Sequence, residues 1–369
     1  MLLVCCLVLV AAGYVFDRQS TPVSTAPVSE REPYVELSMN DRELSLVNVT
    51  VEEWMKWEKE ATELYEQFRT HGDTYGAKIV RIAWGVFDIP DGSFIRKQHF
   101  EIATDADFQN SKSYDLRAGE RSIELYDLLV DTQYFFRITV EIENHEGCTL
   151  TDSFRTKWSP RIIEVENLQN ARDLGGWKTV DGKTVKQGML YRGGELDGAT
   201  NSQFQLTADG AESLCDLLQI RTELDLRQKD LEGARDVLGQ EVVRHCIPSP
   251  AYDGFQSDNG KRNMKALFDT LAEEENYPVY LHCDYGADRT GVACYILEAL
   301  LGMSREDCYR EWELSALANG SGNYEAMDRF VAAFQKLEGE TLQNKAENYL
   351  LSVGITQEQI DSIRDILVP

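Results

Sequence analysis

The chain has 369 residues, of which 37 are basic and 63 are acidic, for a formal net charge of −26 at pH 7. This length allows two domains, each with a hydrophobic core of its own. The acidic balance argues against nucleic acid and against an anionic membrane surface as partners, because both would repel the protein. The eight cysteines show no framework spacing, so we expect no disulfide scaffold.

Residues 1–16 are predicted to be a signal peptide or a membrane anchor. The run 2–16 is uncharged and apolar, has the length of a signal peptide and is short for a membrane span, although no basic stretch precedes it. Residues 17–49 are predicted to be a linker, because their Ser, Thr and Pro show no periodicity. We therefore expect a secreted or cell-envelope-associated protein, held to the envelope through its N-terminus. A buried strand or helix at residues 2–16 is the alternative.

Residues 50–76 are predicted to form a helical connector. Residues 50–53 (Thr-Val-Glu-Glu) have the form of a capping box. Large side chains follow on one helical face, namely Trp54, Trp57, Ala61, Leu64, Tyr65 and Phe68. We expect this face to pack against the next domain.

Residues 77–158 change to a period of two, which predicts a small all-β sandwich. The alternating residues are Val80, Ile82 and Trp84, then Phe100 and Ile102, then Ile123 and Leu125, then Phe136, Ile138, Val140 and Ile142. The pattern resembles a fibronectin type III module, with Trp84 early, Tyr134 as a tyrosine-corner candidate and Phe154 in the closing strand. Such a module usually binds a partner or acts as a spacer.

The stretch 278–302 carries the chemistry. Residues 279–281 (Val-Tyr-Leu) form a strand-like run, and apolar residues recur at helical spacing from Gly291 until Gly302 ends the pattern. A strand that passes into a helix through a tight turn directs backbone N–H groups and the positive helix end at one point, which suits a phosphate dianion. Cys283 follows the strand and is expected at the base of this anion-binding turn.

This stretch is similar to the signature His-Cys-x(5)-Arg-Thr/Ser-Gly of the cysteine-based protein tyrosine phosphatase superfamily, from His282 to Gly291. Its Gly-x-Asp-Arg-Thr-Gly ending resembles the bacterial tyrosine/serine phosphatase branch. Residues 170–176 (Asn-Ala-Arg-Asp-Leu-Gly-Gly) and 190–194 (Leu-Tyr-Arg-Gly-Gly) resemble motifs of the same branch. The resemblance implies an α/β phosphatase domain at residues 162–369, a parallel-rich sheet flanked by helices. It also implies two-step hydrolysis of a phosphomonoester through a cysteinyl-phosphate.

Each residue of the loop suits that chemistry. Cys283 must attack phosphorus as a thiolate, which a helix N-terminus and an arginine stabilise. Arg289 can hold two phosphoryl oxygens in its planar fork, and Gly286 and Gly291 admit a close approach of backbone to ligand. Thr290 can donate its hydroxyl to the thiolate, and in the family it helps to release phosphate. The expected phosphate-binding residues are Asp284, Tyr285, Gly286, Ala287, Asp288 and Arg289.

Further residues are expected to support the loop. His282 is expected to brace it rather than to titrate in catalysis. Asp225 and Arg227 follow a predicted strand, so they should border the site without taking part in bond breaking. Arg192 can face the pocket or form a structural ion pair, for which the candidate partners are Asp173 and Glu195. Residues 311–315 (Glu-Trp-Glu-Leu-Ser) resemble a helical motif that backs the phosphate loop in this branch.

Two aspartates compete for the role of the general acid that protonates the leaving oxygen. Asp253 precedes Cys283 by 30 residues and lies in the loop 248–260, where superfamily members often carry a mobile acid loop. Asp288 lies inside the phosphate loop beside Arg289, as in branches that keep Asp-Arg-Thr. We favour Asp288 as the acid. Its alternative role is to hold the loop by accepting backbone hydrogen bonds.

Other readings of the loop explain fewer of its residues. A zinc site would need paired ligands and a nucleotide loop would need Gly-Lys-Ser/Thr, and neither pattern occurs in this stretch. A cysteine that is merely buried leaves Arg289 and the glycines unexplained. We therefore expect an enzyme that needs no metal and no other cofactor.

The expected substrate is a phosphorylated protein, first of all at tyrosine and also at serine or threonine, or a small phosphomonoester. A phosphoinositide or inositol phosphate phosphatase is the alternative, although lipid-directed relatives typically carry lysine where this chain has Ala287. A phospho-binding pseudophosphatase is an alternative of another class. The intact Cys283 and Arg289 count against it.

Overall fold

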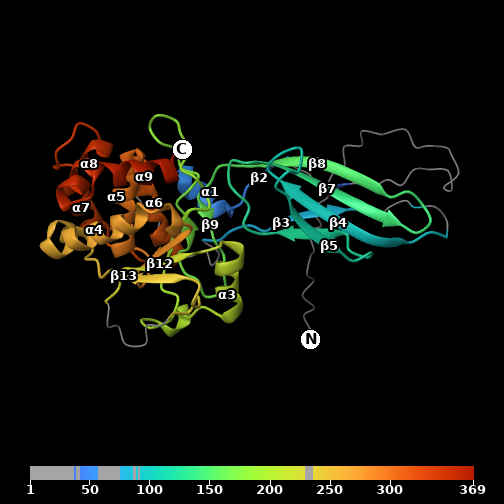
Figure 1. Ribbon diagram of the computed structural model, residues 1–369, viewed down its shortest axis with the longest axis horizontal. Helices are drawn as coiled ribbons and strands as arrows, with labels where there is room; N and C mark the ends of the chain where they lie inside the picture. The colour runs from blue at the N-terminus through green and yellow to red at the C-terminus, as the bar shows by residue number, and fades with distance from the viewer. Residues whose placement is uncertain (1–36, 39–41, 57–74, 86–88, 90–91, 229–235) are drawn as a thin grey trace, which may run out of the picture.

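The computed structural model describes residues 37–38, 42–56, 75–85, 89, 92–228 and 236–369. An N-terminal β region lies beside a C-terminal region in which helices surround a sheet (Figure 1). The predicted signal peptide or anchor, most of the linker and most of the helical connector lie outside the described residues. Within the described ranges, no helix is both long enough and apolar enough to cross a bilayer.

The β region contains two sheets that share one core. One sheet has the order β1-β3-β6 and the other the order β2-β8-β7-β4-β5. The strands are β1 (Leu37–Ser38), β2 (Glu43–Leu44), β3 (Val80–Trp84), β4 (Ile95–Ala103), β5 (Lys112–Leu116), β6 (Ser122–Leu125), β7 (Gln133–Ile142) and β8 (Cys148–Thr156). Ile82 of β3 and Phe136 of β7 are fully buried in the shared core. The likeness to a fibronectin type III module stays a prediction, although the Tyr134 hydroxyl accepts a 2.8 Å hydrogen bond from the Leu129 N–H, as a tyrosine corner would.

Helix α1 (Val49–Lys56) begins two residues earlier than the predicted capping box requires. The Asn48 side chain accepts a 3.0 Å hydrogen bond from the Val51 N–H, so Asn48 caps the helix and Thr50 lies inside it. The capping-box prediction is therefore wrong. Trp54 is fully buried in the same core as the sheet and helices of the C-terminal region, as expected of a helix that packs against the next domain.

The C-terminal sheet has the order β13-β12-β14-β11-β10-β9. Its strands are β9 (Arg161–Ile162), β10 (Arg172–Asp173), β11 (Leu190–Gly193), β12 (Thr222–Asp225), β13 (Val243–Cys246) and β14 (Val279–His282). Strands β11, β14, β12 and β13 are parallel, whereas β10 pairs antiparallel with both of its neighbours, β11 and β9. The prediction of a parallel-rich sheet is confirmed. Both faces are apolar, because Leu281 contributes to one core cluster and the adjacent Tyr280 to another.

Most helices of this region follow the sheet in the chain. They are α3 (Ala208–Glu212), α4 (Asp258–Leu271), α5 (Asp288–Leu301), α6 (Arg305–Asn319), α7 (Tyr324–Phe334), α8 (Leu342–Val353) and α9 (Gln357–Leu367). Helix α3 lies apart from the group α4–α9, with β12 and β13 drawn between them (Figure 1). The core cluster that contains Leu281 includes residues of α4–α9, whereas the cluster that contains Tyr280 includes Leu206 and Leu214 around α3. The sheet is therefore flanked by helices on both faces, as predicted.

Candidate active site

The chain turns sharply where β14 ends. Cys283 follows the strand and is buried, and helix α5 begins at Asp288. Gly286 has a φ of +69°, and a Cβ there would lie 2.3 Å from the Gly193 carbonyl oxygen, so a larger residue does not fit. The predicted order of strand, turn and helix is confirmed. The helix starts three residues before Gly291, which places Asp288 and Arg289 in its first turn, where backbone N–H groups lack partners within the helix.

The carbonyl groups of the turn are held by the protein. The Tyr285 carbonyl accepts hydrogen bonds from the side-chain amides of Asn170 (3.0 Å) and Asn319 (3.2 Å). The Gly286 carbonyl accepts one from Arg192, and the Asp284 carbonyl accepts one from the Glu195 N–H at 3.0 Å. These contacts leave the N–H groups of the turn as its donors for an anion. Sequence reasoning assigned no role to Asn170 or Asn319, whose side chains come from distant segments.

Thr290 and Gly291 follow Arg289 at the start of helix α5. The Thr290 hydroxyl is buried, and within the described residues it has no hydrogen-bond partner. Gly291 packs against helix α6, because a Cβ there would lie 2.4 Å from Cδ1 of Trp312. The prediction that the segment 311–315 backs the loop agrees with this contact. A buried hydroxyl without a partner is costly, so Thr290 is poised to donate to a thiolate or a ligand.

Arg289 makes an ion pair with Asp284 at the mouth of the turn. The two side chains are 24% and 22% exposed, and the second Asp284 oxygen accepts a 2.8 Å hydrogen bond from the Thr200 hydroxyl. Arg289 is therefore the accessible cation of the loop.

The two candidate acids lie in different surroundings. Oδ1 of Asp288 accepts a hydrogen bond from the Tyr252 hydroxyl, and Asp288 is half-buried in the first turn of α5. Asp253 lies in the 3-10 helix η4 (Tyr252–Gln256), where its side chain is 60% exposed and pairs with Arg329 at 3.3 Å. The predicted loop 248–260 is thus largely helical, because α4 begins at Asp258. No sequence pattern predicts the contact between Tyr252 and Asp288, which lie 36 residues apart in the chain.

A buried ion-pair network lies behind the turn. Arg192 is fully buried and pairs with Glu311 at 2.6 Å, and Arg172 pairs with the other oxygen of Glu311 at 2.5 Å. The predicted partners of Arg192 are therefore wrong, since Asp173 pairs with Arg161 and Glu195 with Arg227. Because Arg192 also binds the Gly286 carbonyl, Glu311 holds the phosphate loop through this arginine.

The pKa values of Glu311 and Glu298 are shifted in opposite directions. Burial opposes ionisation of Glu311, but the charges of Arg172 and Arg192 outweigh it and lower its pKa. Burial, followed by repulsion from Glu311, raises the pKa of Glu298 well above its usual range. Burial and the neighbouring Glu311 therefore both favour the neutral form of Glu298, whereas the two arginines favour the charged form of Glu311.

We expect Glu311→Gln to lower the free energy of unfolding by about 3 to 5 kcal/mol, because it leaves two buried guanidinium groups without their counter-ion. Glu298→Gln is the matched control, since an amide has nearly the shape of the neutral acid form that burial favours at this position. It should cost less than about 1 kcal/mol. Urea unfolding at pH 7 measures both values. Equal losses would mean that the two carboxyl groups do not differ in charge.

His282 is fully buried and is fixed by its neighbours. Its ring nitrogens lie 2.9 Å from a Glu223 oxygen and 3.2 Å from the Cys283 carbonyl oxygen. Burial alone lowers the pKa of His282, but the hydrogen bond with Glu223 and the charge of Asp225 outweigh it and raise the pKa. This arrangement fits a bracing role at the end of β14.

Asp225 and Arg227 are each 1% exposed, and their bordering of the site stays a prediction. Glu223, Asp225 and His282 bring three potential metal-ligand atoms within 4.8 Å of one another. Arg244 pairs with both carboxylates and Arg227 with Asp225, so guanidinium groups already neutralise the cluster. The donor set therefore suits an ion-pair network better than a cation site.

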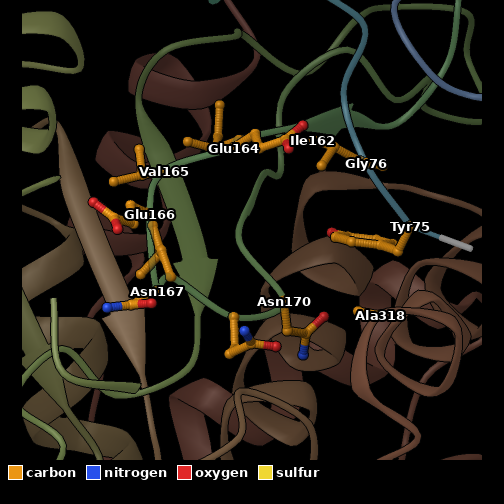
Figure 2. A pocket seen from close by; sticks show the side chains of 12 residues that line it. Tyr75, Gly76, Ile162, Glu164, Val165, Glu166, Asn167, Asn170 and Ala318 are labelled. Atoms are coloured by element: carbon orange, nitrogen blue, oxygen red, sulfur yellow. The ribbon is translucent and has the colours of Figure 1, made fainter. Parts of the chain in front are cut away.

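A cavity of about 480 Å³ adjoins the turn (Figure 2). Ile162 lines this cavity. In the sheet Ile162 pairs with Arg172, which pairs in turn with Arg192 of β11, the strand beside β14. Asn170, which binds the Tyr285 carbonyl, lines it together with Tyr75 and Ala318. Its ionisable lining groups other than Tyr75 are Glu164 and Glu166. The cavity thus adds space beside the loop but no cation.

Comparisons with known proteins identify the class. A family model described as the tyrosine phosphatase family matches residues 163–369. This match covers more than half of the chain, which therefore belongs to the tyrosine phosphatase family. A Cupriavidus necator protein, provisionally named a tyrosine-protein phosphatase, is 29% identical over 189 residues, which are 46% of this chain and 68% of that protein.

Two solved structures are similar over the same region. P. aeruginosa TpbA, in complex with phosphotyrosine, is 18% identical, covers 46% of this chain and 88% of its own, and has a TM-score of 0.31. The core catalytic domain of the S. cerevisiae PP-IP phosphatase SIW14, in complex with citrate, is 14% identical, covers 51% of this chain and 97% of its own, and has a TM-score of 0.30. The TM-scores of these two structures are too low to support an assignment. Family membership therefore rests on the sequence match.

Proposed function

We propose that the chain is a cysteine-dependent protein tyrosine phosphatase that acts through a cysteinyl-phosphate. The observation that carries the proposal is the placement of Cys283 at the base of a turn whose carbonyl groups are tied to the protein, at the N-terminus of α5 and within the same turn as Arg289. A turn of this kind binds a dianion without metal. A buried thiol at its base is placed for in-line attack on phosphorus.

The reaction takes two steps. The Cys283 thiolate forms the S–P bond as the ester P–O bond breaks, and the leaving oxygen takes a proton from a carboxylic acid, which we assign to Asp288. Arg289 leaves Asp284 and binds two phosphoryl oxygens, whose negative charge it stabilises. Water then attacks phosphorus, gives its proton to the same carboxylate, and releases phosphate. Thr290 donates its hydroxyl to the thiolate that re-forms.

The charges around the loop favour a single phosphate with an aromatic neighbour. Asp284 and Asp288 accompany Arg289 in the loop, and the adjoining cavity contributes Glu164 and Glu166, so a ligand with several phosphates meets several carboxylates. Tyr285 is 41% exposed and packs edge-on against Phe204, with ring centroids 5.5 Å apart. This pair offers an apolar edge to a phenyl ring. Phosphotyrosine therefore fits better than an inositol phosphate.

A panel of substrates tests the proposal. Purified protein is assayed with a phosphotyrosine peptide, a phosphoserine peptide, a phosphoinositide and inositol hexakisphosphate, each with and without a chelator. We expect the highest kcat/KM for the phosphotyrosine peptide and no effect of chelation. Faster turnover of the inositol compounds would reverse the substrate assignment. Binding without turnover of any substrate would instead support a pseudophosphatase.

We also propose that the chain acts outside the cytoplasm, with the β region as a fibronectin-like spacer or binding module. The apolar run 2–16 and the linker rich in Ser, Thr and Pro support this proposal, because a cytosolic enzyme has no use for either. Fractionation of producing cells tests it. Full-length protein found in the cytosol would contradict it.

A further inference from the structure

Tyr252 joins the helix that carries the phosphate loop to another part of the fold. Its hydroxyl donates a hydrogen bond to Oδ1 of Asp288 and accepts one of 3.0 Å from the N–H of Asn323, the N-cap of α7. The side chain is 8% exposed, and the residue has a φ of +46°, a conformation that non-glycine residues rarely adopt. Such a backbone persists where the surroundings hold it in place.

The surroundings of η4 supply that support. Phe255 is fully buried, and its ring packs edge-on against Phe330 with centroids 5.0 Å apart. The Tyr349 hydroxyl donates a 2.8 Å hydrogen bond to the Phe255 carbonyl. Gly254 packs so closely that a Cβ there would lie 2.4 Å from Cβ of Pro250. The phenol of Tyr252 is thus presented to Asp288 by a rigid segment.

The two carboxylate oxygens of Asp288 differ in their hydrogen bonding. Oδ1 is bound to Tyr252, whereas Oδ2 has no hydrogen-bond partner among the residues that the structure describes. A general acid must direct one oxygen at the leaving group, and a carboxyl group held at its other oxygen loses the freedom to turn away. The segment that precedes the motif therefore contributes a phenol that orients the acid.

We propose that Tyr252 is a positioning residue for the acid step, holding Oδ1 of Asp288 so that Oδ2 carries the proton to the leaving oxygen. The inference rests on the proposed function. In the first step the proton passes from Oδ2 to the oxygen of the breaking P–O bond, and in the second step water returns a proton to Oδ2. Burial, followed by the hydrogen bond to Asp288, raises the pKa of Tyr252, so the phenol keeps its own proton throughout.

The test compares two substrates on Tyr252→Phe, which removes the hydroxyl alone. With a phosphotyrosine peptide, whose leaving oxygen is basic, kcat should fall on the order of tenfold, the effect of one hydrogen bond to a charged group. With p-nitrophenyl phosphate, whose leaving group departs without a proton, kcat should change less than about twofold. The ratio of the two rates in one preparation does not depend on the fraction of protein that is folded.

Tyr277→Phe is the matched control, because it removes a buried hydroxyl that donates to the Leu271 carbonyl rather than to Asp288 or to η4. It should leave the ratio unchanged. In an Asp288→Asn background, Tyr252→Phe should have no further effect on the ratio, since the residue acts through Asp288. An equal loss on both substrates, no loss, or an additive loss in that background would overturn the inference. If Cys283→Ser retained turnover, the proposed function itself would fail instead.

Discussion

Cys283→Ser is expected to lower kcat for a phosphotyrosine peptide by at least about a thousandfold, because a serine hydroxyl is a far weaker nucleophile than a thiolate at neutral pH. The same variant should still bind the peptide. The turn keeps its amide donors and Arg289, and neither depends on the sulfur atom. Steady-state rates give the first quantity and isothermal titration calorimetry with the phosphopeptide gives the second.

Cys215→Ser provides the control for this prediction. Cys215 is half-buried near α3, and its sulfur lies 3.4 Å from the Leu238 carbonyl oxygen, to which a serine can also donate. Its kcat should stay within about twofold of the unmodified protein. If Cys283→Ser hydrolysed the peptide at a comparable rate, a cysteinyl-phosphate could not be the intermediate. If the Cys283→Ser variant lost binding as well as turnover, the thiolate would be part of the anion-binding site.

The strand, the turn and the helix around Cys283 could be predicted because local patterns determine them. A strand-like run precedes the cysteine, and Gly302 ends α5 as its position in the pattern predicted, with a left-handed φ of +88°. Thr356 caps α9 in a capping box with Gln359, which is again a local signal. At α1 two possible capping residues, Asn48 and Thr50, stand two positions apart, and the local sequence does not decide between them, whereas the structure uses Asn48.

Contacts between distant segments could not be predicted in this way. Arg192 lies 119 residues before Glu311, and nearer carboxylates along the chain offered equally good partners. Strand β5 has an exposed face and almost no buried residue, so it shows no alternation to detect. Tyr252 was missed for a different reason. A search for a carboxylic acid in the preceding segment finds Asp253, whereas the structure brings the phenol beside it to the acid of the phosphate loop.

The choice between Asp288 and Asp253 predicts the second large effect. Asp288→Asn is expected to lower kcat for a phosphotyrosine peptide by about 10² to 10⁴, the usual contribution of a positioned general acid. The loss should be much smaller with p-nitrophenyl phosphate, and the basic limb of the pH–rate profile should flatten. The variant is nearly isosteric, and its carbonyl oxygen can still accept the hydrogen bond from Tyr252, so the fold should be preserved.

Asp253→Asn is the matched control, because its carboxylate is exposed and pairs with Arg329 on the surface. It should change kcat less than about twofold with either substrate, since an exposed ion pair contributes little. Rates with both substrates, measured beside urea unfolding curves, separate a loss of acid catalysis from a loss of stability. If Asp253→Asn showed the dependence on the leaving group and Asp288→Asn only lowered the unfolding free energy, η4 would have to carry the acid to the loop. Asp288 would then serve to hold the first turn of α5 against Tyr252.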